Sequence, residues 1–194
     1  MTALTLLEYS ANAFFLSSVF LAARNHRHTW TLGIIGCVLF AVLFYQVQLY
    51  ADATLMVFYI GTSLVGWQQW QRGAAAADIQ RTPWRLLGVL GLIAIATMLG
   101  YGYLLYLNTD AFAPFADSAV LTFSVVAQLL LMKRRVETWW FWLLVNTIAI
   151  PLYASRDLTL TSLVYVGFWF NACYGFWRWH RELGATCRSV SEPA

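Results

Sequence analysis

The sequence predicts an all-helical (all-α) integral membrane protein with seven transmembrane helices. They form two parallel three-helix repeats joined by one helix, a 3+1+3 plan. Three observations predict this fold: seven apolar stretches, basic residues in alternate gaps between them, and an internal repeat. The chain of 194 residues is 60% hydrophobic, with a mean hydropathy of +0.62. Helices of a soluble domain each show a polar face, and these stretches show none.

The apolar stretches account for nearly the whole chain. Most match the roughly 17–25 residues that a helix needs to cross a bilayer, while the fifth and sixth have only about 15. Charged side chains inside them lie near their ends, at Glu8, Arg85 and Arg178. The stretches are residues 6–23, 30–50, 53–70, 84–107, 118–132, 139–153 and 158–179. The predicted organisation is a first bundle (1–72), a loop with a linker helix (73–110), a second bundle (111–182) and a disordered cytoplasmic tail (183–194).

The charges between the stretches predict the orientation. If successive helices alternate in direction, 11 of the 12 Lys and Arg residues fall on one side and only Arg156 falls on the other. Short cytoplasmic loops carry an excess of Lys and Arg. We therefore expect an outside N-terminus and a cytoplasmic C-terminus, in agreement with an odd number of helices.

An internal repeat indicates how the helices are grouped. A shift of 109 positions places Thr29-Trp30 on Thr138-Trp139, and Gly66 on Gly175. Because one helix is left over between the halves, both three-helix units start on the same side of the membrane. Parallel repeats of this kind occur in small transporters that hold substrate near the bilayer midplane. The alternative is that both halves only reuse interfacial Trp and Arg anchors.

Polar and aromatic side chains within the stretches are the candidate ligand contacts, since a polar group in lipid must be paired or functional. Trp139, Trp142 and Asn146 share one helical face, and Asn171 shares a face with Tyr174. Amides beside indole rings suit a flat heteroaromatic ligand, which stacks on the rings while the amides fix its orientation. The predicted substrate-binding residues are Trp139, Trp142, Asn146, Asn171, Tyr174, Trp67, Gln68, Gln128 and Gln46.

Each candidate also has a structural explanation. Trp residues at span ends form aromatic belts by default, and buried amides can simply join neighbouring helices. We expect no metal site, because His26, His28 and His180 have no Cys or carboxylate companions. We also expect no catalytic residues, no cofactor and no nucleic-acid partner.

Three segments resemble the PnuC-type vitamin transporters, best known for carrying nicotinamide riboside. They are LYADATLMVFYIGTSLVGWQQWQR (49–72), MKRRVETWWFWLLVNTIAIPLY (132–153) and NACYGFWRWHR (171–181). The resemblance implies the three-one-three helix plan of the sugar transporters called SWEETs, a homotrimer with one permeation path per subunit, and a bacterial inner (plasma) membrane location. The chain has Thr62-Ser63-Leu64 ahead of the Gly-Trp pair, where we expect an Asn followed by Tyr in many relatives. This departure leaves thiamine and riboflavin as alternative substrates.

A cationic ring fits the predicted site best, because indole and phenol faces attract cations and no carboxylate lies deep within the apolar stretches. Nicotinamide riboside is therefore the first choice and thiamine the second. Without Asp, Glu or His deep in the spans, facilitated diffusion (uniport) by alternating access is the simplest mechanism. The resemblance implies that a cytosolic kinase then traps the vitamin by phosphorylation. A membrane-embedded lipid enzyme and an accessory membrane subunit are the other hypotheses.

Overall fold

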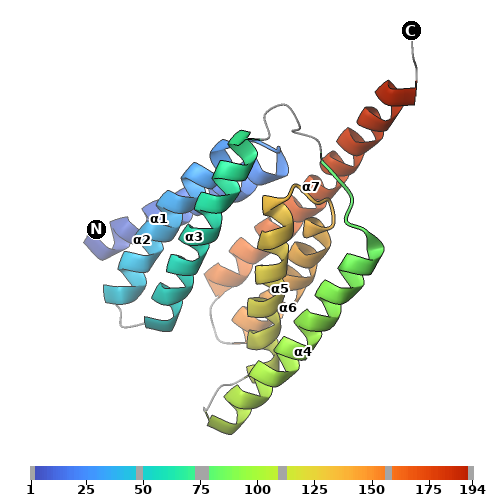
Figure 1. Ribbon diagram of the computed structural model, residues 1–194. Helices are drawn as coiled ribbons and strands as arrows, with labels where there is room; N and C mark the ends of the chain where they lie inside the picture. Colours follow the sequence, from blue (N-terminus) through green and yellow to red (C-terminus); the bar gives the residue numbers. More distant parts are fainter. Residues whose placement is uncertain (1–2, 47–49, 73–78, 109–112, 156–158, 192–194) are drawn as a thin grey trace. The chain divides into compact units, whose positions relative to one another are not determined.

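The computed structural model describes residues 3–46, 50–72, 79–108, 113–155 and 159–191. Seven helices account for almost all of these residues (Figure 1). They are α1 (Ala3–Ala23), α2 (His28–Gln46), α3 (Tyr50–Arg72), α4 (Trp84–Asn108), α5 (Pro114–Met132), α6 (Thr138–Ala154) and α7 (Thr159–Ser191). The predicted all-helical class and the number of helices are confirmed.

Several helix ends differ from the predicted stretches, and two of these differences have an identifiable reason. Helix α5 begins at Pro114, four residues before the predicted start, because proline lacks an N–H and suits the first turn of a helix. The prediction of a disordered tail after residue 182 is wrong as far as Ser191, because α7 continues to that residue. The guanidinium of Arg178 donates to the Glu182 carboxylate at 2.8 Å, and such pairs four residues apart support a helix.

The chain divides into two compact units, residues Met1–Ala77 and Asp78–Ala194. In the first unit, α2 packs against both α1 and α3. In the second unit, α4 packs against α5, α5 against α6, and α6 against α7 (Figure 1). The helix that joins the two predicted repeats is therefore packed into the second unit.

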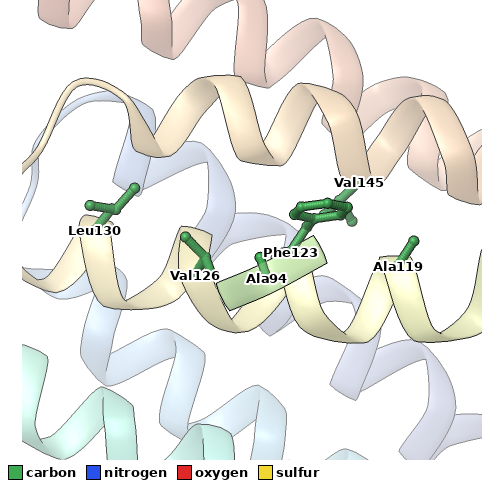
Figure 2. Packing of buried hydrophobic residues seen from close by; sticks show 6 residues of the cluster. All are labelled: Ala94, Ala119, Phe123, Val126, Leu130 and Val145. Carbon is green, nitrogen blue, oxygen red and sulfur yellow. The ribbon is translucent and has the colours of Figure 1, made fainter. Parts of the chain in front are cut away.

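Helix α5 forms the centre of the second unit. Side chains from α4, α5 and α6 meet in one apolar cluster (Figure 2), which consists of Ala94, Ala119, Phe123, Val126, Leu130 and Val145. By contrast, the buried residues of α4 are only Ala94 and Gly102. Helix α4 thus lies at the edge of the unit, and its contacts are with α5.

The α1–α2 turn and the α5–α6 turn have the same backbone conformation. Asn25 and Arg134, which are 109 positions apart, have positive φ angles of 52° and 48°. One residue later, the N–H of His26 donates to the Leu21 carbonyl and that of Arg135 to the Leu130 carbonyl, both at 3.0 Å. Each turn therefore reverses the chain through one left-handed residue.

The first turn of the following helix is fixed in the same way in both units. The hydroxyl of Thr29 donates to the Ser18 carbonyl at 2.7 Å, and the hydroxyl of Thr138 donates to the Ala127 carbonyl at the same distance. Each bond ties the start of one helix to the preceding antiparallel helix. The sequence repeat thus corresponds to repeated hydrogen bonds within the units.

A buried pair of indole rings closes each bundle near these turns. Trp30 meets Trp70 edge to face at 5.4 Å between ring centroids, and Trp139 meets Trp179 at 5.3 Å. One ring of each pair lies directly on a glycine: Trp30 lies on Gly66 in the first unit, and Trp139 lies on Gly175 in the second. A side chain at either glycine would overlap the ring. These contacts explain why Trp and Gly recur together in the sequence repeat.

Three of the described helical segments are long and apolar enough to cross a membrane: Leu6–Ala23 within α1, and the helices Trp84–Asn108 and Pro114–Met132. The apolar helices His28–Leu43 and Thr138–Ala154 are shorter. Their length is compatible with a short or locally thinned crossing. That all seven helices span the bilayer stays a prediction.

Candidate functional site

The predicted ligand face of α6 points into the second unit. Trp139 is 2% exposed and Asn146 is 3% exposed, while Trp142 is half-buried and packs against the apolar cluster formed by α4, α5 and α6. The three residues share one face of the helix, as their spacing predicts. Trp139 packs on Gly175 and Trp179, so it supports the helix pair whatever else it does.

The packing of α6 on α7 brings the two asparagines to the same level. Rings of Trp140 and Phe176 meet at 6.3 Å, and the indole N–H of Trp169 donates to the Thr147 hydroxyl at 3.2 Å. Because the helices are antiparallel, these contacts place Asn146 and Asn171 at one height along the pair. Asn146 is buried and Asn171 is half-buried, with its side-chain oxygen inaccessible to solvent.

Of the other two predicted site residues of the second unit, one is buried and one is exposed. Gln128 on α5 is buried, at 9% exposure. Tyr174 on α7 is exposed, and its ring lies 6.1 Å from that of Trp177. The second unit therefore holds six of the nine predicted residues, on three successively packed helices.

The remaining three predicted residues belong to the first unit and are exposed within the described chain. Gln46 ends α2, and Trp67 and Gln68 lie near the end of α3. By contrast, Trp70, which lies three residues after Trp67 on the same helix, is buried. Sequence position alone does not distinguish Trp67 from Trp70; the difference arises from which side of α3 packs against α2.

The two units differ where the candidate amides lie. At the 109-residue spacing, Cys37 occupies the place of Asn146, and Thr62 occupies the place of Asn171. Cys37 is buried and Thr62 donates its hydroxyl to the Tyr59 carbonyl within its own helix. The turns and Trp pairs are thus repeated, whereas Asn146 and Asn171 have no amide at the equivalent places of the first unit.

A groove of about 320 Å³ runs between α6 and α7. Its size lies at the lower end of the range for small-molecule sites. The lining residues are Thr147, Ile150, Pro151, Val166, Trp169 and Phe170. The sequence analysis did not select these residues, although Thr147 is adjacent to Asn146 and Phe170 to Asn171.

The chemistry of this region suits recognition of an aromatic ring more than bond making. Helix α6 has no Asp, Glu, Lys, Arg or His in its sequence, and the groove is lined by carbon apart from one hydroxyl and one indole N–H. Amides can both donate and accept hydrogen bonds, while indole faces bind flat or cationic rings. No group of three or more His, Cys, Asp or Glu side chains that could bind a metal occurs in the described ranges.

Comparison with known proteins agrees with such a role. The family model described as nicotinamide mononucleotide transporter matches residues 5–181. The nicotinamide riboside transporter PnuC of Escherichia coli is 28% identical, over 87% of this chain and 84% of its own. PnuC of Neisseria mucosa is also 28% identical, over 83% and 66% of the two chains.

A third relative, the riboflavin/roseoflavin transporter RibM of Streptomyces davaonensis, is 26% identical over 92% of this chain and 86% of its own. The fold is similar to the crystal structure of the vitamin B3 transporter PnuC, with a TM-score of 0.75, 22% identity, and coverage of 93% of this chain and 83% of that chain. The chain therefore belongs to the nicotinamide mononucleotide transporter family and is a membrane transporter rather than an enzyme.

Proposed function

We propose that this protein carries nicotinamide riboside across the membrane. The observation that carries the proposal is the family match over residues 5–181, together with relatives named as nicotinamide riboside transporters. The second unit adds chemical support, because Asn146 and Asn171 lie at one level of a helix pair rich in indole rings.

The ligand's charge distribution fits these residues. Nicotinamide riboside contains a pyridinium ring, which gains about 0.5–2 kcal/mol from an aromatic face, depending on how far the ring is desolvated. The candidate aromatic residues are Trp142, Tyr174 and Trp67, and the candidate amides are Asn146 and Asn171. A mid-membrane carboxylate is not needed to bind this cation, and α6 supplies none.

Riboflavin is the second candidate. It is supported by RibM, whose similarity covers 92% of this chain. Riboflavin is a larger neutral ring system and gains nothing from cation–π attraction, so it would depend on stacking and on the amides. Thiamine, a thiazolium cation, resembles nicotinamide riboside in this respect and is the third ligand to compare.

The proposed mechanism is facilitated diffusion by alternating access, with the vitamin trapped by cytosolic phosphorylation. Proton-coupled carriers place acidic or His side chains within their spans. The acidic residues of the described helices lie near helix starts, as in the first turn of α5 (Asp117), or, like Glu182, beyond the apolar part of α7. A uniporter needs no such group.

The proposed arrangement has two like-oriented three-helix repeats linked by α4. The repeated turns at Asn25 and Arg134 and the repeated Trp pairs support it. We further propose seven membrane crossings in the bacterial inner membrane, with the N-terminus outside and the C-terminus in the cytoplasm, on the basis of the Lys and Arg distribution. The assembly proposed from the family resemblance is a homotrimer.

Titration calorimetry and liposome uptake test these proposals. Purified protein is titrated with nicotinamide riboside, thiamine and riboflavin, and uptake of the labelled ligand is followed with no ion gradient. Tightest binding of riboflavin would replace the proposed substrate. A requirement for a sodium or proton gradient would refute uniport.

The variant Asn171→Leu tests the site. We expect it to lose vitamin binding while its size in detergent is unchanged. Asn108→Leu is the matched control, because Asn108 is exposed at the end of α4 and its side-chain amide donates to the Leu104 carbonyl of its own helix. Unchanged binding in Asn171→Leu, or changed assembly without a ligand effect, would contradict the proposed site.

A further inference from the structure

The chain enters the second unit along a short segment that pairs with the α5–α6 turn. We call this segment, residues 79–83, the strap. The N–H of Gln80 donates to the Arg134 carbonyl and the N–H of Val136 donates to the Gln80 carbonyl, both at 3.0 Å. The two bonds form an isolated parallel β-bridge between Gln80 and Arg135. The strap therefore lies against the turn in one defined register.

A buried carboxylate extends this pairing. Glu137, immediately before α6, is 5% exposed, and its Oε2 accepts a hydrogen bond from the backbone N–H of Thr82 at 2.8 Å. Thr82 and Ile79 are also buried. Burying a charge is costly unless hydrogen bonds compensate it, so Glu137 is an unusual choice for a position that needs only packing.

Two arginines add contacts at the exposed edge of the strap. The Arg135 guanidinium donates to the Arg81 carbonyl at 2.6 Å, and the Arg81 guanidinium donates to Nε2 of His180 at 3.0 Å. Burial lowers the pKa of the neighbouring Arg134 guanidinium. The strap is thus joined to the α5–α6 turn and to α7.

The equivalent turn of the first unit has no such carboxylate. His28 occupies the place of Glu137 at the 109-residue spacing and is exposed, whereas Thr29 and Thr138 make the same bond in both units. Glu137 is therefore not part of the repeated turn. Its contact with Thr82 is a feature of the second unit alone.

The strap leads directly into α4, which has few other attachments. Helix α4 begins at Trp84 and packs against α5, with Ala94 in the apolar cluster that contains Val145. Val145 is adjacent to Asn146. Ala94 lies about 15 Å along the helix from Trp84 at 1.5 Å per residue, so the start of α4 determines how it meets α5, which in turn packs on α6.

We propose that Glu137 is a positioning residue for transport: by holding Thr82 it fixes the start of α4, and through the apolar cluster it fixes the part of α6 that carries Asn146. This inference rests on the proposed function, because it assumes that Asn146 lies in the ligand site. Glu137 itself does not contact the vitamin in this scheme.

Hydrogen exchange followed by mass spectrometry tests the contact independently of transport. In Glu137→Ala, we expect the amide of Thr82 to exchange about ten- to a hundredfold faster, because its hydrogen bond to a charged acceptor is lost. Glu137→Gln keeps an acceptor oxygen and should exchange at an intermediate rate. Glu182→Ala is the control, since Glu182 pairs with Arg178 on α7 and should leave the strap unchanged.

Uptake kinetics test the effect on the site. We expect Glu137→Ala to raise the KM of uptake several-fold with Vmax per folded protein retained, and Glu137→Gln to restore much of the loss. A merely structural role would lower the amount of folded protein and leave KM unchanged. Unchanged KM in Glu137→Ala, or unchanged exchange at Thr82, would overturn the proposal.

The assay uses whichever of the three vitamins the wild-type protein binds. If the wild-type protein binds none of them, the proposed function fails. The exchange rates then still decide whether Glu137 holds the strap, because they do not depend on a ligand.

Discussion

Substitution of Gly175 by alanine tests the buried Trp pair. A Cβ at this position would lie 2.6 Å from Cζ2 and 2.7 Å from Cε2 of the Trp139 ring, well inside van der Waals contact. The ring has little room to retreat, because Trp139 is buried and its other neighbour is the ring of Trp179. Either α6 and α7 separate or the indole leaves its preferred rotamer.

The expected cost follows from overpacking. Adding a methyl group to a filled site typically destabilises a protein by about 1–3 kcal/mol. For a chain of this size, this corresponds to a fall in Tm of about 2–12 °C. Gly66→Ala should behave alike, because its Cβ would lie 2.6–2.8 Å from the Trp30 ring in the first unit.

Thermal unfolding of the purified protein in detergent is the assay, and Gly167→Ala is the matched control. Gly167 lies two turns earlier in α7 with open space around it, so alanine there should be neutral or stabilise the helix by up to about 1 kcal/mol. If Gly175→Ala unfolds at the same temperature as Gly167→Ala, the indole does not occupy the described position, and the steric reasoning fails.

Three further predictions concern single contacts. Thr138→Val and Thr29→Val should each lower the free energy of unfolding by about 1 kcal/mol, since each removes a hydrogen bond to a carbonyl of the preceding helix. Thermal unfolding measures this loss, and a loss in only one of the two variants would argue against equivalent turns. Glu182→Gln should change stability by less than about 0.5 kcal/mol, because its pair with Arg178 is half-exposed; a fall of several degrees in Tm would contradict this. Trp169→Phe should leave the fold intact and remove the hydrogen-bond donor to Thr147. If the groove between α6 and α7 belongs to the ligand site, calorimetry should show weaker vitamin binding in this variant. Unchanged affinity would mean that the groove does not take part in vitamin binding.

Several features were predictable from sequence because they depend on local pattern. Runs of apolar residues determine where helices form, and the predicted α4 and α6 agree with the structure to within one residue at each end. The recurrence of Thr-Trp and Gly at one spacing indicated equivalent turns, and the hydrogen bonds of Thr29 and Thr138 are indeed the same. The continuation of α7 beyond residue 182 was missed because polarity was taken as a sign of disorder, although the segment up to Ser191 contains no proline.

The chain's own pattern therefore determined the helices, the repeated turns and the family, because helix formation and turn geometry depend on residues close together in sequence. The roles of individual rings and charges were decided only by packing. Trp139 and Trp67 look alike in sequence, yet one is buried on Gly175 and the other is exposed. The sequence pattern assigned no role to Glu137, because the strap that its carboxylate contacts lies 55 residues earlier in the chain. Burial and hydrogen bonding between distant segments depend on which faces meet, and only the tertiary structure specifies that.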